Sequence, residues 1–442
     1  MKCFLSIFIF LLYSCLSYGQ NITTIGGNGS AIHSGDNGPA TSAGIIQPRA
    51  VAVDDLGNIY VGDLYDHCVR KISAIGIITT IVGIPGSFGY NGDNIPAVNA
   101  KLHDPFGIAV DKKRNIYIAD AANHRIRKID TAGIITTIGG TGTGGYNGDS
   151  ISATSAQLKY PLGVATDSLG NVYVSDAHNY RIRKIDTFGF IYTIAGTGSS
   201  GSNGDNGPAT AANVYPNGIV LDGMNVVYFS DSNMVRKISA SGIITTIAGN
   251  GTLSSTGDGG VATAATLSCE GIALGSGGII YLTDYSHNRI RRIDNWGIIN
   301  TIAGTGFCGA LGDNGPATAA SVCAATGVAV DTAGNIYVAD LANQRVRKIY
   351  QHTVGVSLTF LSTIESISIH PNPTNGKFML KVSSEQEWVC ISVVDRLGRE
   401  IKRVNSTAAK QISITIDAPD GVYFVKINTP SGTETKQIII NH

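Results

Sequence analysis

The sequence predicts an all-β protein, a six-bladed β-propeller followed by a small β-sandwich. The first observation is a stretch between Leu102 and Gly140 that contains four short runs rich in β-branched residues, separated by turn residues. This arrangement is typical of a four-stranded antiparallel meander. The second is that nearly the same stretch recurs at a spacing that suits a propeller blade with a connecting loop. The third is the distribution of the 55 glycines over many turns, which favours an all-β protein.

Residues 1–19 are expected to be a signal peptide. Lys2 supplies the positive charge, and the apolar run from Phe4 to Leu12 is too short to span a bilayer. The small residues of Ser17-Tyr-Gly19 then fit a cleavage site, so the protein is expected to be exported.

The mature chain is expected to begin at Gln20 or Asn21. Lipoprotein processing at Cys15 is an alternative, but the bulky Tyr13 fits that signal poorly. No later apolar run reaches the roughly 20 residues of a membrane helix. We therefore expect no transmembrane segment in the mature chain.

Six copies of the repeat align on the isoleucine that ends one strand: Ile25, Ile81, Ile138, Ile194, Ile247 and Ile302. The steps between them are 56, 57, 56, 53 and 55 residues. The other three strands of each unit begin near Ala50, Gly107, Gly163, Gly218, Gly271 and Gly327. The propeller is therefore assigned to residues 21–350.

The order of the strands predicts how the ring closes. The chain opens with a lone fourth strand, Ile22 to Ile25, and the repeat region ends with a third strand, Arg345 to Ile349. If these two strands pair, they complete the sixth blade and hide edge strands that promote aggregation. We expect a closed ring with one strand from the N-terminal end of the repeats and three from the C-terminal end.

Each second strand ends in Asp, and each third strand contains Arg, seven residues later in five blades and five residues later in the fourth. An Asp and an Arg at this spacing can pair across a hairpin. Because both occur in every blade, we interpret them as structural ion pairs rather than catalytic groups. They are Asp63 and Arg70, Asp120 and Arg127, Asp176 and Arg183, Asp231 and Arg236, Asp284 and Arg291, and Asp340 and Arg347.

A long glycine-rich segment, here called the excursion, joins each fourth strand to the next first strand. Pro39 and the small residues after it predict a capped helix of one or two turns. Every excursion also repeats one Asp, but a calcium site needs several converging oxygens. Capping of the local backbone is the preferred interpretation of these residues, Asp36, Asp93, Asp149, Asp205, Asp258 and Asp313.

Charge and cysteine content exclude some classes of protein. The net charge is zero and 14% of residues are charged, which argues against a nucleic-acid-binding protein. The five cysteines after the signal peptide are too few for a disulfide framework. Cys308 and Cys323 lie in one excursion and could form a bridge in an oxidising compartment. A bridge between Cys269 and Cys323, or buried free thiols, are the alternatives.

Residues that differ between blades are free to serve a ligand. The loops between second and third strands and the excursions are expected on one face, where loops on a rigid scaffold usually carry function. Aromatic rings beside amides suit a protein or glycan surface. The candidates are Tyr65, His67, Tyr90, Asn123, His124, Tyr146, His178, Asn179, Tyr285, His287 and Asn343, with Phe88, Tyr160, Tyr215 and Phe307 as further rings. The alternative is that these rings only pack the loops onto the propeller.

The repeat period ends at Tyr350. Residues 351–365 are expected to be a linker. Residues 366–442 contain alternating strands separated by turns, which predicts a small immunoglobulin-like β-sandwich.

The repeats resemble a known family. The sequence Asn123-His-Arg-Ile-Arg-Lys-Ile129, with Gly-Ile-Ala-Val-Asp before it and Thr-Thr-Ile-Gly-Gly after it, resembles the NHL repeat. The inserted Gly-Asp-Asn-Gly-Pro-Ala-Thr segments resemble the teneurin-type NHL subgroup. The resemblance covers residues 21–350 and implies a six-bladed propeller.

The C-terminal segment also resembles a family, the type A sorting domain of type IX secretion cargo. The matching parts are Pro371-Asn-Pro-Thr-Asn-Gly376, Asp395-Arg-Leu-Gly398, Gly421-Val-Tyr-Phe424 and Lys436-Gln-Ile-Ile-Ile440. The resemblance implies that the type IX secretion machinery recognises residues 366–442 and moves the chain across the outer membrane, to the cell surface or the medium. In that family the domain is usually removed. An adhesive immunoglobulin-like module is the alternative.

The function expected from these observations is an exported binding scaffold for a protein or a glycan, without cofactor or metal. The alternative is a lyase or a lactonase-type hydrolase, because some NHL-like propellers hold zinc through histidines near the central channel. Here His67, His124, His178 and His287 lie on different blades, and His103 stands alone near a first strand. Zinc–nitrogen bonds are only ~2 Å long, so histidines on outer hairpins cannot share one ion.

Overall fold

The structure is a computed structural model that describes residues 20–351, 368–381, 390–395, 399–404, 411–429 and 432–441. It divides into two compact units, Met1–Thr353 and Val354–His442. The predicted signal peptide and nearly all of the predicted linker lie outside the described residues. Within the described residues, no helix has the length and apolar character needed to cross a membrane.

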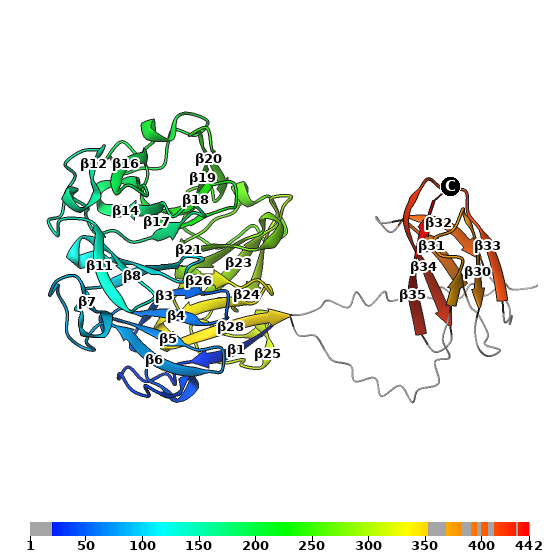
Figure 1. Cartoon of the computed structure of the whole chain (residues 1–442), viewed down its shortest axis with the longest axis horizontal. Helices are drawn as coiled ribbons and strands as arrows, with labels where there is room; N and C mark the ends of the chain where they lie inside the picture. Colours follow the sequence, from blue (N-terminus) through cyan, green and yellow to red (C-terminus); the bar gives the residue numbers. More distant parts are fainter. Residues whose placement is uncertain are drawn as a thin grey trace, which may run out of the picture. The chain divides into compact units, whose positions relative to one another are not determined.

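Six antiparallel sheets form the first unit, and Figure 1 shows them arranged in a ring. Blade 1 is β3 (Pro48–Val53), β4 (Ile59–Asp63), β5 (Cys68–Ile72) and β6 (Ile77–Val82), and blade 2 is β8 (Pro105–Val110), β9 (Ile116–Asp120), β10 (Arg125–Ile129) and β11 (Ile134–Gly139). Blade 3 is β13 (Val164–Thr166), β14 (Val172–Asp176), β15 (Arg181–Ile185) and β16 (Phe190–Ala195), and blade 4 is β17 (Pro216–Leu221), β18 (Val227–Asp231), β19 (Met234–Ile238) and β20 (Ile244–Ala248). Blade 5 is β21 (Cys269–Leu274), β22 (Ile280–Asp284), β23 (Arg289–Ile293) and β24 (Ile299–Ala303), and blade 6 is β26 (Ala325–Val330), β27 (Ile336–Asp340), β28 (Arg345–Gln351) and β1 (Gln20–Gly26).

The ring closes as the sequence predicts. Strand β1 pairs antiparallel with β28, with Ile22 opposite Ile349 and Thr24 opposite Arg347. Figure 1 shows the blue β1 beside the yellow β28. Each first strand contacts the first strands of both neighbouring blades, including β26 against β3. The predicted six-bladed propeller with a one-plus-three closure is therefore confirmed.

Apolar side chains fill the spaces between blades. One cluster joins Tyr60 and Val69 of blade 1 to Ile116 and Ile118 of blade 2. The second strands β4, β9, β14, β22 and β27 are buried along their whole length because each has a blade on both faces. Strands covered on both faces are apolar in nearly every position, which matches these sequences.

The repeated glycines let neighbouring first strands approach each other at the centre. A Cβ atom added to Gly107 would lie 2.4 Å from the carbonyl oxygen of Leu162, and one added to Gly163 would lie 2.3 Å from that of Asn217. Real Cβ atoms do not approach backbone oxygens this closely. The glycines are therefore required by packing at the channel wall and do not mark a ligand site.

The excursions contain less helix than the sequence predicts. Each holds one turn of 3-10 helix: η1 (Ala40–Ser42), η2 (Ala97–Asn99), η4 (Ala153–Ser155), η6 (Ala209–Ala211), η7 (Ala262–Ala264) and η10 (Ala317–Ala319). No side chain caps these turns. Four excursions instead add a fifth strand to the outer edge of a blade, namely β2 (Gly38–Pro39), β7 (Ile95–Pro96), β12 (Ile151–Ser152) and β25 (Gly315–Pro316). Pairing with the blade edge gives hydrogen-bond partners to backbone N–H and C=O groups that a longer helix would otherwise pair internally.

Each third strand buries one arginine completely. In five blades its guanidinium lies 3.1–3.5 Å from the Asp that ends the second strand. The same arginines, and Arg70 of blade 1, lie 2.7–3.1 Å from the repeated Asp of the excursion. The expectation that the excursion carboxylates cap local backbone is therefore wrong for Asp36, Asp93, Asp149, Asp205, Asp258 and Asp313. Each instead forms an ion pair with the buried arginine, and in five blades it shares that arginine with the Asp of the second strand.

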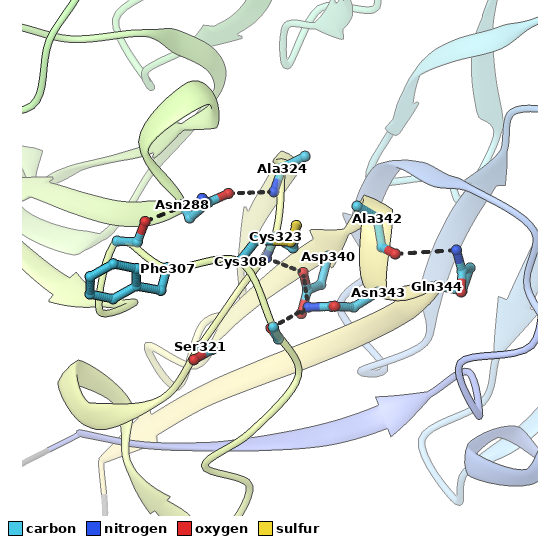
Figure 2. The surroundings of a disulfide bond; sticks show 12 residues. Asn288, Phe307, Cys308, Ser321, Cys323, Ala324, Asp340, Ala342, Asn343 and Gln344 are labelled. Carbon is cyan, nitrogen blue, oxygen red and sulfur yellow. Dashed lines mark hydrogen bonds between the residues drawn. A yellow bond between two sulfur atoms is a disulfide. The ribbon is translucent and has the colours of Figure 1, made fainter.

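A disulfide joins Cys308 and Cys323, one of the pairings that the sequence left open. Figure 2 shows this bridge beside Asp340, whose carboxylate accepts a 2.8 Å hydrogen bond from the Cys323 N–H. Cys68 and Cys269 are free and buried. The bridge links the beginning of the last excursion, after β24, to its end, directly before β26.

The remaining small elements lie in turns. The loops between second and third strands contain η3 (Ala121–Asn123), η5 (Ala177–Asn179), η9 (Tyr285–His287) and η11 (Leu341–Asn343). A further turn, η8 (Ser276–Gly278), lies in the hairpin between β21 and β22.

Two sheets form the second unit. One is β29 (Ser368–His370), β30 (Lys377–Lys381) and β33 (Gln411–Thr415), and the other is β32 (Glu400–Val404), β31 (Cys390–Val394), β34 (Gly421–Thr429) and β35 (Gly432–Ile440). Phe378 and Leu380 of the first sheet share a buried core with Ile391 and Val425 of the second. Two sheets enclosing one core make a β-sandwich, as predicted.

Candidate functional site

The channel at the centre of the propeller narrows to a small cavity of about 90 Å³. Its wall comes from three consecutive residues of each first strand, around Ala50, Gly107, Gly163, Gly218, Gly271 and Gly327. The first strands begin where the excursions end, so the start of each strand lies at the mouth on the excursion face. A ligand therefore meets the side chains at these strand starts first.

Two opposite charges meet at this mouth. Arg49 of blade 1 lies 2.5 Å from Glu270 of blade 5, and the two side chains are 12% and 22% exposed. The Arg49 guanidinium also lies over the ring of Phe106 in blade 2, 4.2 Å from its centroid. Because the two charges neutralise each other, this pair makes the mouth polar and adds no net charge to it.

An arc of rings continues from Phe106 around the mouth. Phe106 contacts Tyr160 edge-on at 5.9 Å, and Tyr160 stacks on His178 at 5.0 Å. Tyr215 lies 6.4 Å from His178 and 5.7 Å from Tyr180. The arc, made of Phe106, Tyr160, His178, Tyr215 and Tyr180, therefore runs over blades 2 to 4.

Tyr160 is the central member of the arc. Its hydroxyl donates a 2.8 Å hydrogen bond to Asp104. Burial, followed by this bond, raises the pKa of Tyr160 to about 12, while Arg49 acts in the opposite direction. Tyr65 also lies close enough to raise this pKa. Tyr160 therefore stays neutral and joins the charged pair to the ring arc.

Two of the predicted ligand-binding histidines connect neighbouring blades. His124 Nδ1 accepts a 3.0 Å hydrogen bond from the Tyr160 N–H, and His67 Nδ1 accepts one of 3.3 Å from the Asp104 N–H. Asn288 does the same at this position of blade 5, where its Oδ1 accepts a 2.9 Å bond from the Ala324 N–H. These side chains therefore have a partner in the next blade.

Most other predicted ligand-binding residues also have partners within the propeller. Asn123, Asn179 and Asn343 each donate both to the Asp of their own blade and to a glycine carbonyl of the excursion. Tyr90 and Tyr146 donate to the excursion Asp and lie 3.9 Å under an arginine. His287 Nδ1 lies 2.8 Å from Asp284. Tyr65 is 60% exposed, His178 is exposed and Tyr285 is partly exposed.

The aromatic side chains of the excursions are likewise either exposed or in contact with other residues of the propeller. Phe88 contacts His67 and His103 and is 61% exposed, while Phe307 is 79% exposed beside the disulfide. Tyr160 and Tyr215 belong to the arc. Among the residues predicted for a ligand-binding face, the ring contacts lie in blades 1 to 4, and their role in binding stays a prediction.

Sequence reasoning missed Arg49, Phe106 and Glu270. They occupy one repeat position, directly before the residue where each first-strand unit was aligned. That position reads Arg49, Phe106, Leu162, Asn217, Glu270 and Thr326 around the ring. This position varies between blades, whereas the prolines and glycines around it repeat. That variation was the signal available in the sequence.

Comparison with known proteins follows the same division of the chain. The Teneurin NHL domain model matches residues 84–147, 140–203 and 198–257, and the NHL repeat model matches residues 46–72 and 323–349. The Secretion system C-terminal sorting domain model matches residues 368–441. The chain is a teneurin-type NHL-repeat propeller with a sorting domain. This sorting domain indicates export by type IX secretion, to the medium or to the cell surface, and implies an interaction with that machinery.

The NHL-repeat chain is similar to parts of much longer proteins. It is 27% identical to human Teneurin-4 over 359 residues, which cover 71% of this chain and 12% of the teneurin. It is 25% identical over 413 residues to Protein SUPPRESSOR OF QUENCHING 1, chloroplastic, of Arabidopsis thaliana, covering 88% of this chain and 38% of that protein. The chain thus spans well under half of either relative.

Solved structures share the propeller fold of this NHL-repeat chain. A protein of unknown function from Bacteroides thetaiotaomicron has a TM-score of 0.56 at 21% identity, covering 75% of this chain and 76% of its own. An auxiliary nutrient binding protein from Bacteroides ovatus has a TM-score of 0.55 at 15% identity, with the same coverage of both chains. Similarity at this level of identity establishes the fold alone.

Proposed function

We propose that this exported propeller is a binding protein whose ligand docks at the channel mouth on the excursion face. The carrying observation is the Arg49–Glu270 pair at the mouth, continued by the ring arc from Phe106 to Tyr180. Paired charges beside aromatic rings favour an uncharged polar ligand, since the rings offer stacking surfaces and the pair offers donors and acceptors. A glycan fits this chemistry better than a charged peptide.

The size of the site supports the same choice. A cavity of about 90 Å³ holds only the end of a ligand, so the rest would lie across the ring arc. The nutrient-binding name of the Bacteroides ovatus neighbour is compatible with a glycan ligand, although that protein shares only the fold. The exposed Tyr65 beside the arc extends the stacking surface.

The enzyme alternative receives no comparable support. Within residues 20–351, the one group of metal-ligating side chains that converges is in blade 1 and not among the residues lining the channel. His67 and His124 are engaged as acceptors from the next blade. A lyase or lactonase centred on these histidines would need them to leave those partners.

The proposal is tested by screening the secreted full-length protein on immobilised glycans and on extracellular protein extracts. We expect selective glycan binding that is lost in Phe106→Ala and Tyr160→Phe/His178→Ala. Phe188→Ala is the matched control, since Phe188 is 86% exposed in the hairpin between β15 and β16, at the opposite end of the blade from the loop between its second and third strands. Binding only to proteins, unaffected by Phe106→Ala, would overturn the proposal.

A further inference from the structure

Blade 1 departs from the other blades at three positions that meet in space. Its excursion has His33 where blades 2 and 3 have Tyr90 and Tyr146, three residues before the excursion Asp. Its loop between second and third strands has Asp66 where blades 2, 3 and 6 have an asparagine. Its third strand begins with Cys68 where blades 2, 3, 5 and 6 begin with an arginine, namely Arg125, Arg181, Arg289 and Arg345.

The exchanged residues were partners of each other in the repeat. In blade 2, Arg125 lies 3.9 Å from the ring of Tyr90, and Asn123 donates 2.9 Å to Asp120. Blade 1 replaces the stacked Tyr and Arg by His33 and Cys68, and replaces the amide donor by the acceptor Asp66. All three exchanges introduce a residue type that binds metal ions.

Together with Asp63, these residues form one tight cluster. One ligand atom each from His33, Asp63, Asp66 and Cys68 lies within 4.8 Å of the others. His33 Nδ1 forms an ion pair with Asp66, and Cys68 Sγ lies 3.6 Å from the same carboxylate. Tetrahedral ligands at Zn–N and Zn–O distances of ~2.0–2.2 Å and a Zn–S distance of ~2.3 Å lie about 3–4 Å apart, so His33 and Asp66 would separate and the more distant ligands would draw in around the ion.

The charge balance of the cluster also differs from that of the other blades. Asp63 is fully buried and Asp66 is 2% exposed. In the other five blades the Asp that corresponds to Asp63 forms an ion pair with the arginine of the third strand. In blade 1 this arginine, Arg70, pairs with Asp36 and donates hydrogen bonds to the carbonyl oxygens of Gly44 and Ser34. The Asp63 carboxylate accepts the Ile46 and Gln47 N–H groups at 2.9 and 3.0 Å. Asp63 therefore lacks the arginine contact that the repeat supplies, and it lies beside a second buried carboxylate, Asp66, which favours a bound cation.

We propose that blade 1 holds a zinc ion coordinated by His33, Asp63, Asp66 and Cys68. A ligand set of one thiolate, one imidazole and two carboxylates, with ligand atoms within 4.8 Å of one another, suits Zn²⁺ better than Ca²⁺ or Mg²⁺, which prefer oxygen alone. Binding releases the proton of the Cys68 thiol to solvent. The ion would tie the first excursion to blade 1, next to the strand that closes the ring, and the partly exposed His33 leaves a path for its entry.

The test uses the secreted full-length protein, incubated with zinc and freed of excess metal before metal analysis. We expect about one zinc per chain, and with cobalt in its place a thiolate-to-cobalt absorption band. Cys68→Ser should abolish the band and weaken zinc binding at least about tenfold, because losing even an outer partner of a metal site costs about 10- to 100-fold. Cys269→Ser, which removes the other free buried thiol of residues 20–351, should leave both unchanged.

A second variant keeps the test decisive if Cys68→Ser folds poorly. His33→Tyr/Asp66→Asn/Cys68→Arg restores the residues of blades 2 and 3 and should fold without retaining zinc. Zinc should then raise the melting temperature of the native chain and not of this variant. The proposal is overturned if the native chain retains no zinc, if the cobalt band persists in Cys68→Ser, or if the restored variant binds zinc as well as the native chain does.

Discussion

At the scale of the residue, one side chain often serves two blades. His124 lies in the loop of blade 2, yet it accepts its hydrogen bond from Tyr160, which leads into blade 3. The ring of Tyr160 then contacts Phe106 and His178 at the mouth. The position of a ring at the channel mouth is therefore fixed by a histidine that hydrogen-bonds within the protein.

The first prediction concerns the pH dependence of stability. Burial lowers the pKa of His124, and nearby positive groups lower it further: His178, Arg125, Lys159 and His103. In the unfolded chain His124 binds a proton near pH ~6.5, which is above its pKa in the folded protein. The contribution of neutral His124 to the free energy of unfolding is therefore present above about pH 6.5 and is lost as the pH falls through the folded pKa. His124→Asn should reduce this loss of stability at low pH, because Asn288 shows that an amide oxygen accepts the same hydrogen bond.

The measurement is the urea midpoint of the native and His124→Asn proteins between about pH 7.5 and 5.5. Burial raises the pKa of Asp120 and Asp176 to about 6, which acts in the opposite direction in this range. The informative quantity is therefore the difference between the two proteins. An identical pH dependence would show that His124 is not the group that titrates.

At the scale of the element, the excursions do more than connect blades. Each supplies the carboxylate that neutralises a buried arginine, and four of them add an edge strand to a blade. The repeated Asp was visible in the sequence, but its partner was not, because the excursion meets the third strand only after the blade has folded. The last excursion carries the Cys308–Cys323 disulfide (Figure 2).

The disulfide should stabilise the propeller. It closes a loop with a sequence separation of 15 residues, for which loop entropy gives roughly 3 kcal/mol. Cys308→Ser/Cys323→Ser should lower the free energy of unfolding by up to about that amount, and reductant should then have no further effect. Chemical denaturation with and without reductant measures this, with Cys269→Ser as a control that stays sensitive to reductant. An unchanged midpoint in the double variant would contradict the prediction.

At the scale of the whole molecule, the repeat predicted nearly all of the fold. The six aligned isoleucines gave the blades, and the lone Ile22–Ile25 strand gave the closure that β1 and β28 form. The candidate site could be predicted less well, because only the structure reveals the hydrogen-bond partners of His67, His124 and Asn123. Arg49 and Glu270 lie 221 positions apart in the sequence, and nothing local indicates that they meet across the channel.

Removal of the sorting domain should stop export. Deleting residues 366–442 removes the segment that the sorting-domain model matches, and the propeller is a separate compact unit. We expect the truncated protein to be retained inside the cell, measured by immunoblots of the medium, surface and periplasm. Unchanged amounts outside the cell would mean that another signal directs export.

The most direct test of the central claim is the affinity of the full-length protein for its screened glycan, compared between native protein and Phe106→Ala by titration calorimetry. Truncating a central aromatic contact typically costs more than 1 kcal/mol. We expect a loss of roughly tenfold or more in affinity for Phe106→Ala, with Phe188→Ala unchanged. Equal affinity for the native protein and Phe106→Ala, or a loss only in Phe188→Ala, would contradict a binding site at the channel mouth.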